Sequence, residues 1–265
     1  MKKNKIFIGN DSFRVTSVHD PYARYMKYAY RKDTRRLRNL AFTLKKNYKF
    51  NGSIADVGAN IGITTMILSK IFKDSNIFAF EANPEIFKIL LENLKEYKNI
   101  KLFRKAVSDG TEANLEFFGI SAFGHVSKKN SKSSIKVSAV TLKEVLKEQG
   151  IQKFDLVKID VEGFELDVFK GLGNSAKVIF FEFNPYCINA FYEKSCHKVL
   201  SNIFLKYKLF KFKSDHELEE IISKRSLEGF ILNTFRKNII NDLVAIPRKN
   251  SSLELFKNKK LIIHK

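Results

Sequence analysis

Residues 53–65, SIADVGANIGITT, join a short apolar run to a helix-like pattern through a turn that holds two glycines and an asparagine. Glycine in such a turn allows a tight bend and a close approach of ligand to backbone, because no Cβ obstructs it. In open α/β sheets, ligands bind beyond the carboxyl ends of the strands, commonly against the first strand-to-helix turn. The stretch therefore predicts an α/β fold with a small-molecule site beside Gly58, Asn60 and Gly62.

Further apolar runs follow this one, and segments with apolar residues at intervals of three and four separate most of them. Strands that alternate with such amphipathic helices are typical of a mostly parallel sheet covered on both faces. We therefore expect a doubly wound, mostly parallel seven-stranded sheet. Two β-like runs between the third and fourth core strands, ANLEFFG and SSIKVSAV, predict an inserted β-hairpin. The seven core runs are SIADVG, IFAFE, IKLFRKAVS, FDLVKID, VIFFEF, YKLFKF and DLVAIP.

The chain reads as one folding unit. Residues 21–48 are aromatic and basic at helical spacing and predict an N-terminal helical cap within residues 1–50, while residues 51–265 form the main domain. No Pro-, Gly- or Ser-rich linker separates the two. The chain has no apolar run of about 18 residues and no signal-peptide pattern, so we expect a cytoplasmic protein without a membrane span. Cys187 and Cys196 lie nine positions apart without a second pair, which predicts neither a zinc site nor a disulfide framework.

Acidic residues near the glycine turn indicate the kind of ligand. Asp56, two positions before Gly58, places a carboxylate at the site, which disfavours a phosphate group and favours a cation. The spacing departs from the G-x-G-x-x-G pattern of dinucleotide sites, because Asn60 replaces the second glycine. Glu81 ends the next strand, where an acidic residue accepts ribose hydroxyls. These features indicate a ligand with a ribose and a positive charge but no pyrophosphate, and S-adenosylmethionine fits that description.

Four blocks of sequence resemble the FkbM family of class I S-adenosylmethionine-dependent methyltransferases. They are DVGANIG, FEANPE, KAVSDG and KIDVEGFELDVFKG. The resemblance implies a Rossmann-like fold and methyl transfer to hydroxyl groups, often of sugars or secondary metabolites. It implies that Glu81 holds the ribose and that Ser108 and Asp109 sit beside the adenine. It also implies that four residues line the methionine end of the cofactor, namely Asp56, Gly58, Asn60 and Gly62.

Candidate catalytic residues lie mainly in the last of these blocks. Asp160 and Glu162 stand two positions apart at a strand end, where alternate residues share one face. Asp160 is expected at both the cofactor and the acceptor, and the alternative role for Glu162 is a cap on the following helix. His125, in the inserted segment, is a third candidate base because histidine titrates near neutral pH.

Two residues after the fifth strand, Asn184 and Tyr186, are expected to contact the acceptor. They belong to an Asn-Pro-aromatic run like that of methyltransferases acting on nucleobase amines. In those enzymes the run follows the fourth core strand, and here KIDVEG takes that place. The position therefore argues against a nucleobase amine as the acceptor.

The net charge of +20 leaves more than one function open. The first is an O-methyltransferase whose partner is a saccharide or a small metabolite, and it is the one we favour. The second is an RNA methyltransferase, suggested by the charge and by Arg35, Arg36 and Arg38. Against it, the lysines are spread along the whole chain, which is typical of a solvated surface. The third is a non-catalytic S-adenosylmethionine-binding protein, which the intact acidic residues of the four blocks argue against.

Overall fold

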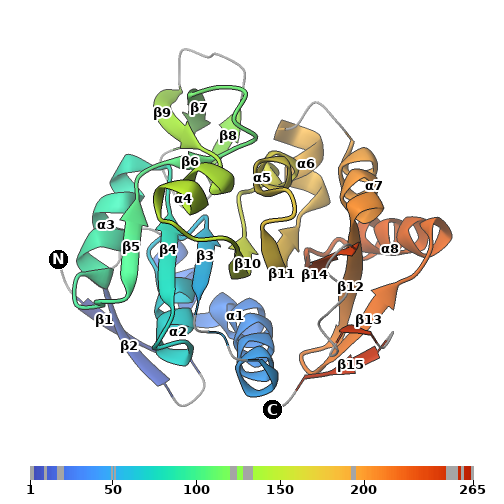
Figure 1. Ribbon diagram of the computed structural model, residues 1–265, viewed down its shortest axis with the longest axis horizontal. Coiled ribbons are helices and arrows are strands. Elements are labelled where there is room, and N and C mark those ends of the chain that lie inside the picture. The colour runs from blue at the N-terminus through green and yellow to red at the C-terminus, as the bar shows by residue number, and fades with distance from the viewer. Residues whose placement is uncertain are drawn as a thin grey trace.

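The computed structural model of the protein describes most of the chain, and its strands and helices alternate through the centre of the sequence (Figure 1). A long helix precedes this alternating region, and a strand-rich segment interrupts it. The described residues are 3–8, 11–16, 21–48, 50, 52–119, 124–127, 134–191, 195–248, 256–257 and 260–263.

Nine strands of the described chain form one mixed sheet, in the order β15-β13-β12-β14-β11-β10-β3-β4-β5. The five strands from β11 to β5 run parallel to one another, and β14 pairs antiparallel with both β11 and β12. The bounds are β3 Ser53–Val57, β4 Asn76–Phe80, β5 Ile100–Phe103, β10 Phe154–Ile159, β11 Ala176–Phe183, β12 Tyr207–Ser214, β13 Glu217–Ile221, β14 Asn241–Pro247 and β15 Lys260–Ile262.

All seven predicted runs contribute a strand to this sheet, but the expected number of seven strands is wrong. The third run is divided, since β5 ends at Phe103 and the next two strand residues pair elsewhere. The two extra strands, β13 and β15, extend the edge beyond β12 through antiparallel pairing. The sequence of β13, ELEEI, is mostly acidic, and β15 has only three residues, so neither forms an apolar run.

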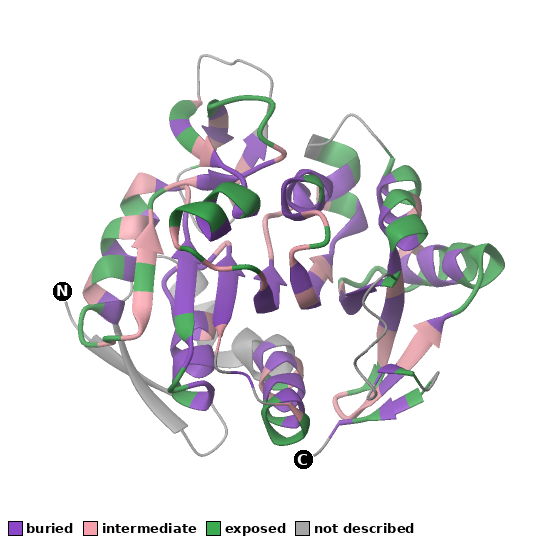
Figure 2. Cartoon of the chain, in the orientation of Figure 1, coloured by how far each residue is buried: buried purple, intermediate pink, exposed green. Residues whose placement is uncertain are grey.

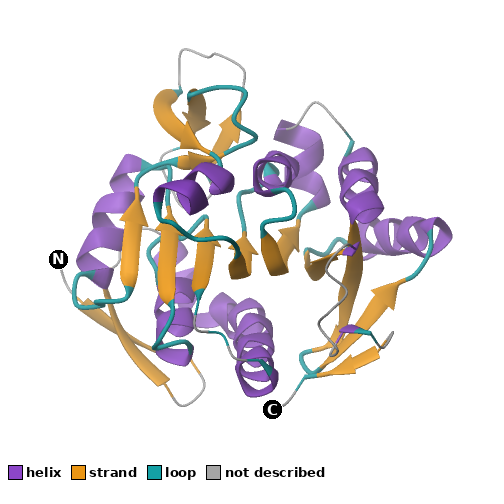
Figure 3. Ribbon diagram, viewed as in Figure 1, coloured by secondary structure: helices purple, strands orange, loops and turns teal. Residues whose placement is uncertain are grey.

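Helices cover both faces of the sheet, as the doubly wound prediction requires (Figures 2 and 3). Buried residues of α1, α2 and α3 form one apolar cluster, and those of α4, α5, α7 and α8 form another. Neighbouring residues of β3 divide between the two, since Ile54 belongs to the first and Ala55 to the second. The bounds are α1 Pro21–Asn47, α2 Ile63–Ile71, α3 Pro84–Leu94, α4 Leu142–Glu148, α5 Glu165–Leu172, α6 Pro185–Phe191, α7 Cys196–Lys206 and α8 Lys224–Lys237.

The inserted segment forms a second sheet, which stands above β4 and β5 at the top of Figure 1. The predicted hairpin is present as β7 Asn114–Phe118 paired antiparallel with β9 Ile135–Val140. In the described residues, β8 His125–Ser127 and β6 Ala106–Val107 complete a sheet in the order β6-β9-β7-β8. Its apolar face packs against Phe164, which follows β10, so the insertion covers the carboxyl ends of the parallel strands.

The N-terminal segment contains the predicted helix, α1, and also an antiparallel hairpin that was not predicted, β1 Lys3–Ile8 with β2 Asp11–Thr16. The backbone of Thr16 exchanges two hydrogen bonds with the side chain of Asn93 on α3. The same amide group donates to the carbonyl of Ile61, so one buried side chain joins the hairpin to the glycine turn. Among the described helices, none has the length and apolar character needed to cross a membrane.

Candidate functional site

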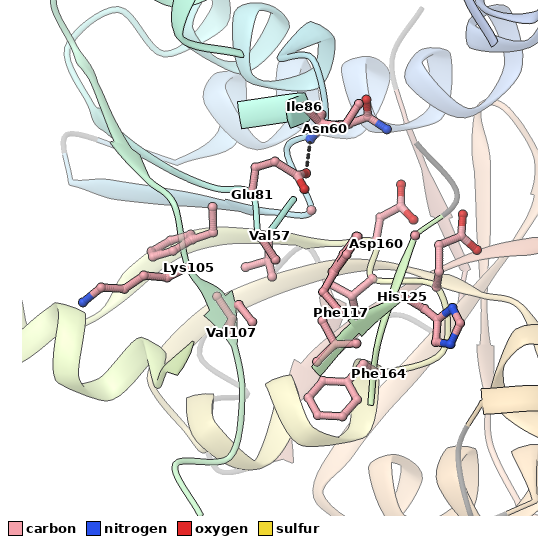
Figure 4. A pocket seen from close by; sticks show the side chains of 18 residues that line it. Val57, Asn60, Glu81, Ile86, Lys105, Val107, Phe117, His125, Asp160 and Phe164 are labelled. Carbon is pink, nitrogen blue, oxygen red and sulfur yellow. Dashed lines mark hydrogen bonds between the residues drawn. The ribbon is translucent and has the colours of Figure 1, made fainter. Parts of the chain in front are cut away.

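A pocket lies where β3, β4 and β10 end, between the main sheet and the inserted sheet. It encloses about 750 Å³ of empty space, part of which is open to solvent. The turn after β3 and Glu81 form one part of its wall, and Asp160, Glu162 and His125 form another (Figure 4).

The turn after β3 is shaped by residues with positive φ angles. Gly58 has φ +75°, Asn60 has φ +52° and Gly62 has φ +95°. A Cβ at position 58 would lie 1.8 Å from the carbonyl oxygen of Asp160, so only glycine fits between the two loops. Gly58 and Asn60 line the pocket, whereas Gly62 packs against the side chain of Leu90 on α3. The turn thus exposes backbone to a ligand, as its glycines predict.

Glu81 is held in the pocket by the backbone around it. Its carboxylate accepts a hydrogen bond from the backbone N–H group of Asn60, at 2.9 Å (Figure 4), and another from the backbone N–H group of Asn83, at 2.8 Å. Burial raises the pKa of Glu81 to about 7, against the lowering effect of these two hydrogen bonds. A fixed carboxylate with two oxygens is a suitable acceptor for a pair of vicinal hydroxyls, such as those of a ribose.

Asp56 is fully buried and lies behind the turn. Its Oδ2 accepts hydrogen bonds from the hydroxyls of Thr64 and Thr65, both at 2.7 Å, and its Oδ1 lies 3.3 Å from the ammonium group of Lys158. It is outside the described set of residues that line the pocket. In this arrangement Asp56 anchors the start of α2 and a buried cation, and its expected contact with the methionine end of a cofactor stays a prediction.

The two candidate acids after β10 both face the pocket, although the alternation argument does not apply to them. β10 ends at Ile159, so Asp160 and Glu162 belong to the following loop, where Glu162 adopts φ +50°. The Glu162 carboxylate accepts from Asn184 Nδ2 at 3.4 Å and from Cys187 Sγ at 3.3 Å. Burial, followed by the nearby charge of Asp160, raises the pKa of Glu162 to about 7. The helix-cap alternative is not what forms, because Phe164 holds the N-cap position of α5.

Carboxylates gather at this end of the pocket. Asp160, Glu162 and Glu182 each place an oxygen within 4.8 Å of the others. Burial raises the pKa of Glu165 to about 8 and the pKa of Glu182 well above its usual range. Carboxylate oxygens are ligands for hard divalent cations, but such groups also occur without an ion. We therefore assign no metal ion to these three carboxylates.

His125 lies on β8 and lines the pocket from the inserted sheet. Its ring stacks on that of Phe118, with 5.3 Å between the ring centroids and 9° between the planes. Partial burial lowers its pKa, which favours the neutral imidazole near pH 7. In Figure 4 its ring and the side chain of Lys105 stand at opposite sides of the pocket.

Ser108 and Asp109, expected beside an adenine, follow β6 and are outside the described pocket lining. The Ser108 hydroxyl accepts from the backbone N–H of Gly110, and the Asp109 carboxylate lies 3.5 Å from the ammonium group of Lys170. Both side chains therefore stabilise the loop between β6 and β7. A role beside the adenine stays a prediction.

Asn184 and Tyr186, expected at the acceptor, lie just behind the pocket. The Asn184 side chain donates to Glu162, as described, and accepts from the backbone N–H of Cys187 at the start of α6. Tyr186 packs edge-on against Phe235 of α8 and remains partly exposed. Asn184 thus acts on a pocket residue rather than facing the pocket itself, and a direct contact with an acceptor stays a prediction for both.

Some pocket features were not singled out from the sequence. Lys158, on β10, is buried and contacts Gly58 and Asp160 as well as Asp56. Its signal is present in FDLVKID, where a lysine interrupts a strand that is otherwise buried along its whole length. Phe117 lines the pocket from β7. In the sequence it could not be distinguished from the many other apolar residues that are expected in the core. A charged residue inside a fully buried strand is the more informative of these two signals.

Comparisons with known proteins support the same interpretation of the chain. Residues 56–212 match the model of the methyltransferase FkbM domain. The hexuronic acid methyltransferase AglP of Haloferax volcanii is 34% identical over 128 residues, which cover 48% of this chain and 52% of that protein. Methyltransferase sdnD of Sordaria araneosa is 29% identical over 173 residues, covering 48% of this chain and 62% of that protein. The matches therefore span little more than half the length of these relatives.

Solved structures that are similar to this chain share little sequence with it. The structure of StiE O-MT residues 961–1257 aligns with a TM-score of 0.47 and 11% identity, covering 89% of this chain and 81% of that one. The match to the family model establishes the family of this chain. The matched residues include the turn after β3, Glu81 and the loop after β10. The chain belongs to the FkbM methyltransferase domain family.

Proposed function

We propose that the protein is an S-adenosylmethionine-dependent O-methyltransferase that acts on a hydroxyl of a saccharide or a small metabolite. The observation that carries the proposal is the composition of the pocket wall. A glycine turn and Glu81 lie on one part of it, and Asp160, Glu162 and His125 lie on another. One part suits a ribose-containing cofactor, and the other offers several groups able to accept a proton.

The residues present fit S-adenosylmethionine, the cofactor that family membership supports. The turn after β3 contributes Gly58 and Asn60 to the pocket lining, where a ligand can approach the backbone. Glu81 presents a fixed carboxylate for the ribose hydroxyls. Asp160 places a partly exposed negative charge at the pocket, where it favours a cationic group such as a sulfonium.

When bound, the cofactor supplies an electrophilic methyl group on a positively charged sulfur. This chain's residues would hold the acceptor hydroxyl in line with that methyl group, and a base among them would take up the hydroxyl proton. Alignment by the pocket walls supplies much of the rate. A correctly placed base adds about 10²–10⁴-fold.

Three side chains are candidates for that base. Glu162, whose pKa is raised to about 7, is partly in the basic form at neutral pH, and the lowered pKa of His125 favours its basic, neutral form there. Asp160 lies between Glu162 and the cation of Lys158, which stabilises its charge. The name of the Haloferax volcanii relative, a hexuronic acid methyltransferase, supports a sugar as the acceptor. The RNA alternative gains no comparable support, because the arginines that suggested it contact the protein itself.

The experiment that tests this function is transfer of a labelled methyl group to separate pools of polysaccharide, small metabolites and RNA. We expect label in the saccharide or metabolite pool, and a large loss of it in Asp160→Asn. Glu85→Gln is the matched control, since Glu85 is an exposed acid on α3 near the same edge of the sheet. Label that enters RNA alone would contradict the proposal, as would cofactor binding without transfer to any pool.

A further inference from the structure

We propose that Lys158 is a positioning residue that holds the cofactor turn and the acceptor wall in one fixed arrangement. The inference rests on the proposed function, because it names what maintains the relation between the two parts of that site. Lys158 does not line the pocket, so its action passes through other residues.

The ammonium group of Lys158 contacts both loops at once. Its Nζ donates to the carbonyl oxygen of Gly58 at 2.8 Å, within the turn after β3. It also lies 3.4 Å from Asp160 Oδ2, on the wall after β10. The third contact, 3.3 Å to Asp56 Oδ1, fixes the ammonium group to a carboxylate that the start of α2 already holds. One side chain therefore joins the two loops to a rigid part of the core.

The backbones of the two loops also touch, so a shift in one is transmitted to the other. The backbone N–H of Asp160 donates to the carbonyl of Val57 at 3.0 Å. The missing Cβ of Gly58 leaves space that the carbonyl of Asp160 occupies. Without the ammonium group, the Gly58 carbonyl loses its donor and the Asp160 side chain loses its nearest cation. Both changes occur at the pocket surface, although Lys158 itself is buried.

A lysine on the neighbouring strand provides a comparison. Lys177 on β11 pairs with Asp155 on β10 at 2.6 Å, near the opposite end of these strands. Its side chain is 41% exposed, and neither residue is among those that line the pocket. The two lysines thus form ion pairs from neighbouring strands, but only Lys158 reaches the site. This makes Lys177 a matched control for the loss of a lysine ion pair.

The test is a double-mutant cycle on the binding of S-adenosylhomocysteine, measured by calorimetry. We expect Lys158→Met to weaken binding about tenfold or more. For the double variant Lys158→Met/Asp160→Asn, we expect a fold loss in affinity that is at least about threefold smaller than the two single losses multiplied together. The two losses overlap because the lysine acts through that carboxylate. Lys177→Met combined with Asp160→Asn should give the product of the single effects within about twofold. With acceptor, Lys158→Met should lower kcat as well as raise the KM of the cofactor.

A variant that keeps the buried charges balanced separates positioning from folding. Lys158→Met leaves the buried Asp56 carboxylate without its cation, which destabilises the fold. Asp56→Asn/Lys158→Met removes both charges, and we expect it to fold and still to bind S-adenosylhomocysteine about tenfold more weakly. A folded double variant that binds as the wild type does would overturn the proposal. The proposal would also be overturned if the affinity losses of Lys158→Met and Asp160→Asn multiplied in the double variant, because that would show no coupling between the two residues.

The outcomes of the binding measurements with S-adenosylhomocysteine do not depend on the acceptor. If the wild-type protein binds S-adenosylhomocysteine but transfers no label to a hydroxyl compound, the proposed function fails and the binding cycle still decides the role of Lys158. If label is transferred and the cycle shows no coupling, the role of Lys158 fails and the proposed function stands.

Discussion

We expect cofactor binding to depend on pH through Glu81, the residue proposed to accept the ribose hydroxyls. A carboxylate accepts ribose hydroxyls better when it is ionised, and burial raises the pKa of Glu81 to about 7. Binding then favours the ionised form, so affinity for S-adenosylhomocysteine should rise as the pH increases through 7 and level off above it. Glu81→Gln should weaken binding by about 1–3 kcal/mol at high pH, because the charged acceptor is lost. Calorimetry on both sides of neutrality measures the two effects together.

The control for this prediction is Glu85→Gln, which changes an exposed acid four residues further along the chain. It should leave both the affinity and its pH dependence unchanged. In Glu81→Gln, by contrast, the contribution of residue 81 to the pH dependence should disappear. An unaltered affinity in Glu81→Gln would mean that the ribose lies elsewhere in the pocket.

Some residues at the pocket could be predicted from the sequence and others could not. Gly58 and Glu81 were found because backbone geometry and strand ends constrain residue type at those positions. Lys158 was not found, because two of its three partners, Gly58 and Asp56, lie on β3 or in the turn after it, far from Lys158 in the sequence. Asp160 and Glu162 were expected together for a reason that does not hold, since both follow the end of β10. Their proximity comes from the turn at Glu162, whose positive φ no spacing rule indicates.

Elements were predictable where burial is uniform along them. The strands that are buried on both faces, such as β3 and β10, form apolar runs that are recognisable in the sequence. β13 has glutamates at its other positions, and only Leu218 and Ile221 are buried. Its pairing with β12 therefore depends on tertiary contacts, and not on a pattern that a window of sequence contains.

The attachment of α1 to the sheet provides a prediction at this scale. Arg36 is mostly buried, with Nη1 2.9 Å from Asp242 on β14 and Nε 3.4 Å from Asp215 after β12. Arg36→Gln removes a mostly buried partner of the buried Asp242 carboxylate and should lower the free energy of unfolding by about 3 kcal/mol. Arg35, which is 54% exposed and also pairs with Asp215, should contribute no more than about 1 kcal/mol. Chemical denaturation of the two single variants measures the difference.

Equal stability losses in Arg36→Gln and Arg35→Gln would contradict the buried pairing.

A single cooperative transition in the wild type would agree with the prediction that the N-terminal segment and the main domain form one folding unit. A separate early transition, lost when residues 1–50 are removed, would show that they unfold independently. Arg36 reports on this attachment, because it joins α1 to β14 and to the turn between β12 and β13.

For the whole molecule, the question is whether the charge of +20 has a polyanionic partner. The arginines that suggested RNA have contacts within the protein. Arg35 and Arg36 form ion pairs, and the guanidinium carbon of Arg38 lies 4.8 Å from the ring centroid of Phe42. A side chain that is held in this way is less available to follow a phosphate backbone. We therefore expect this part of α1 to contribute little to binding of nucleic acid.

The test replaces Arg35 and Arg38 with Gln and keeps Arg36, whose loss would destabilise the fold. Each phosphate contact removed from single-stranded RNA lowers the slope of log affinity against log salt by roughly 0.7. We expect the double variant and the wild type to show the same shallow slope for a generic RNA, because dispersed lysines attract it weakly and these arginines do not add to it. Methylation of a saccharide acceptor should also be the same in both proteins across about 50–200 mM salt. A steep slope in the wild type that collapses in the double variant would instead place RNA on α1 and make it the substrate to pursue.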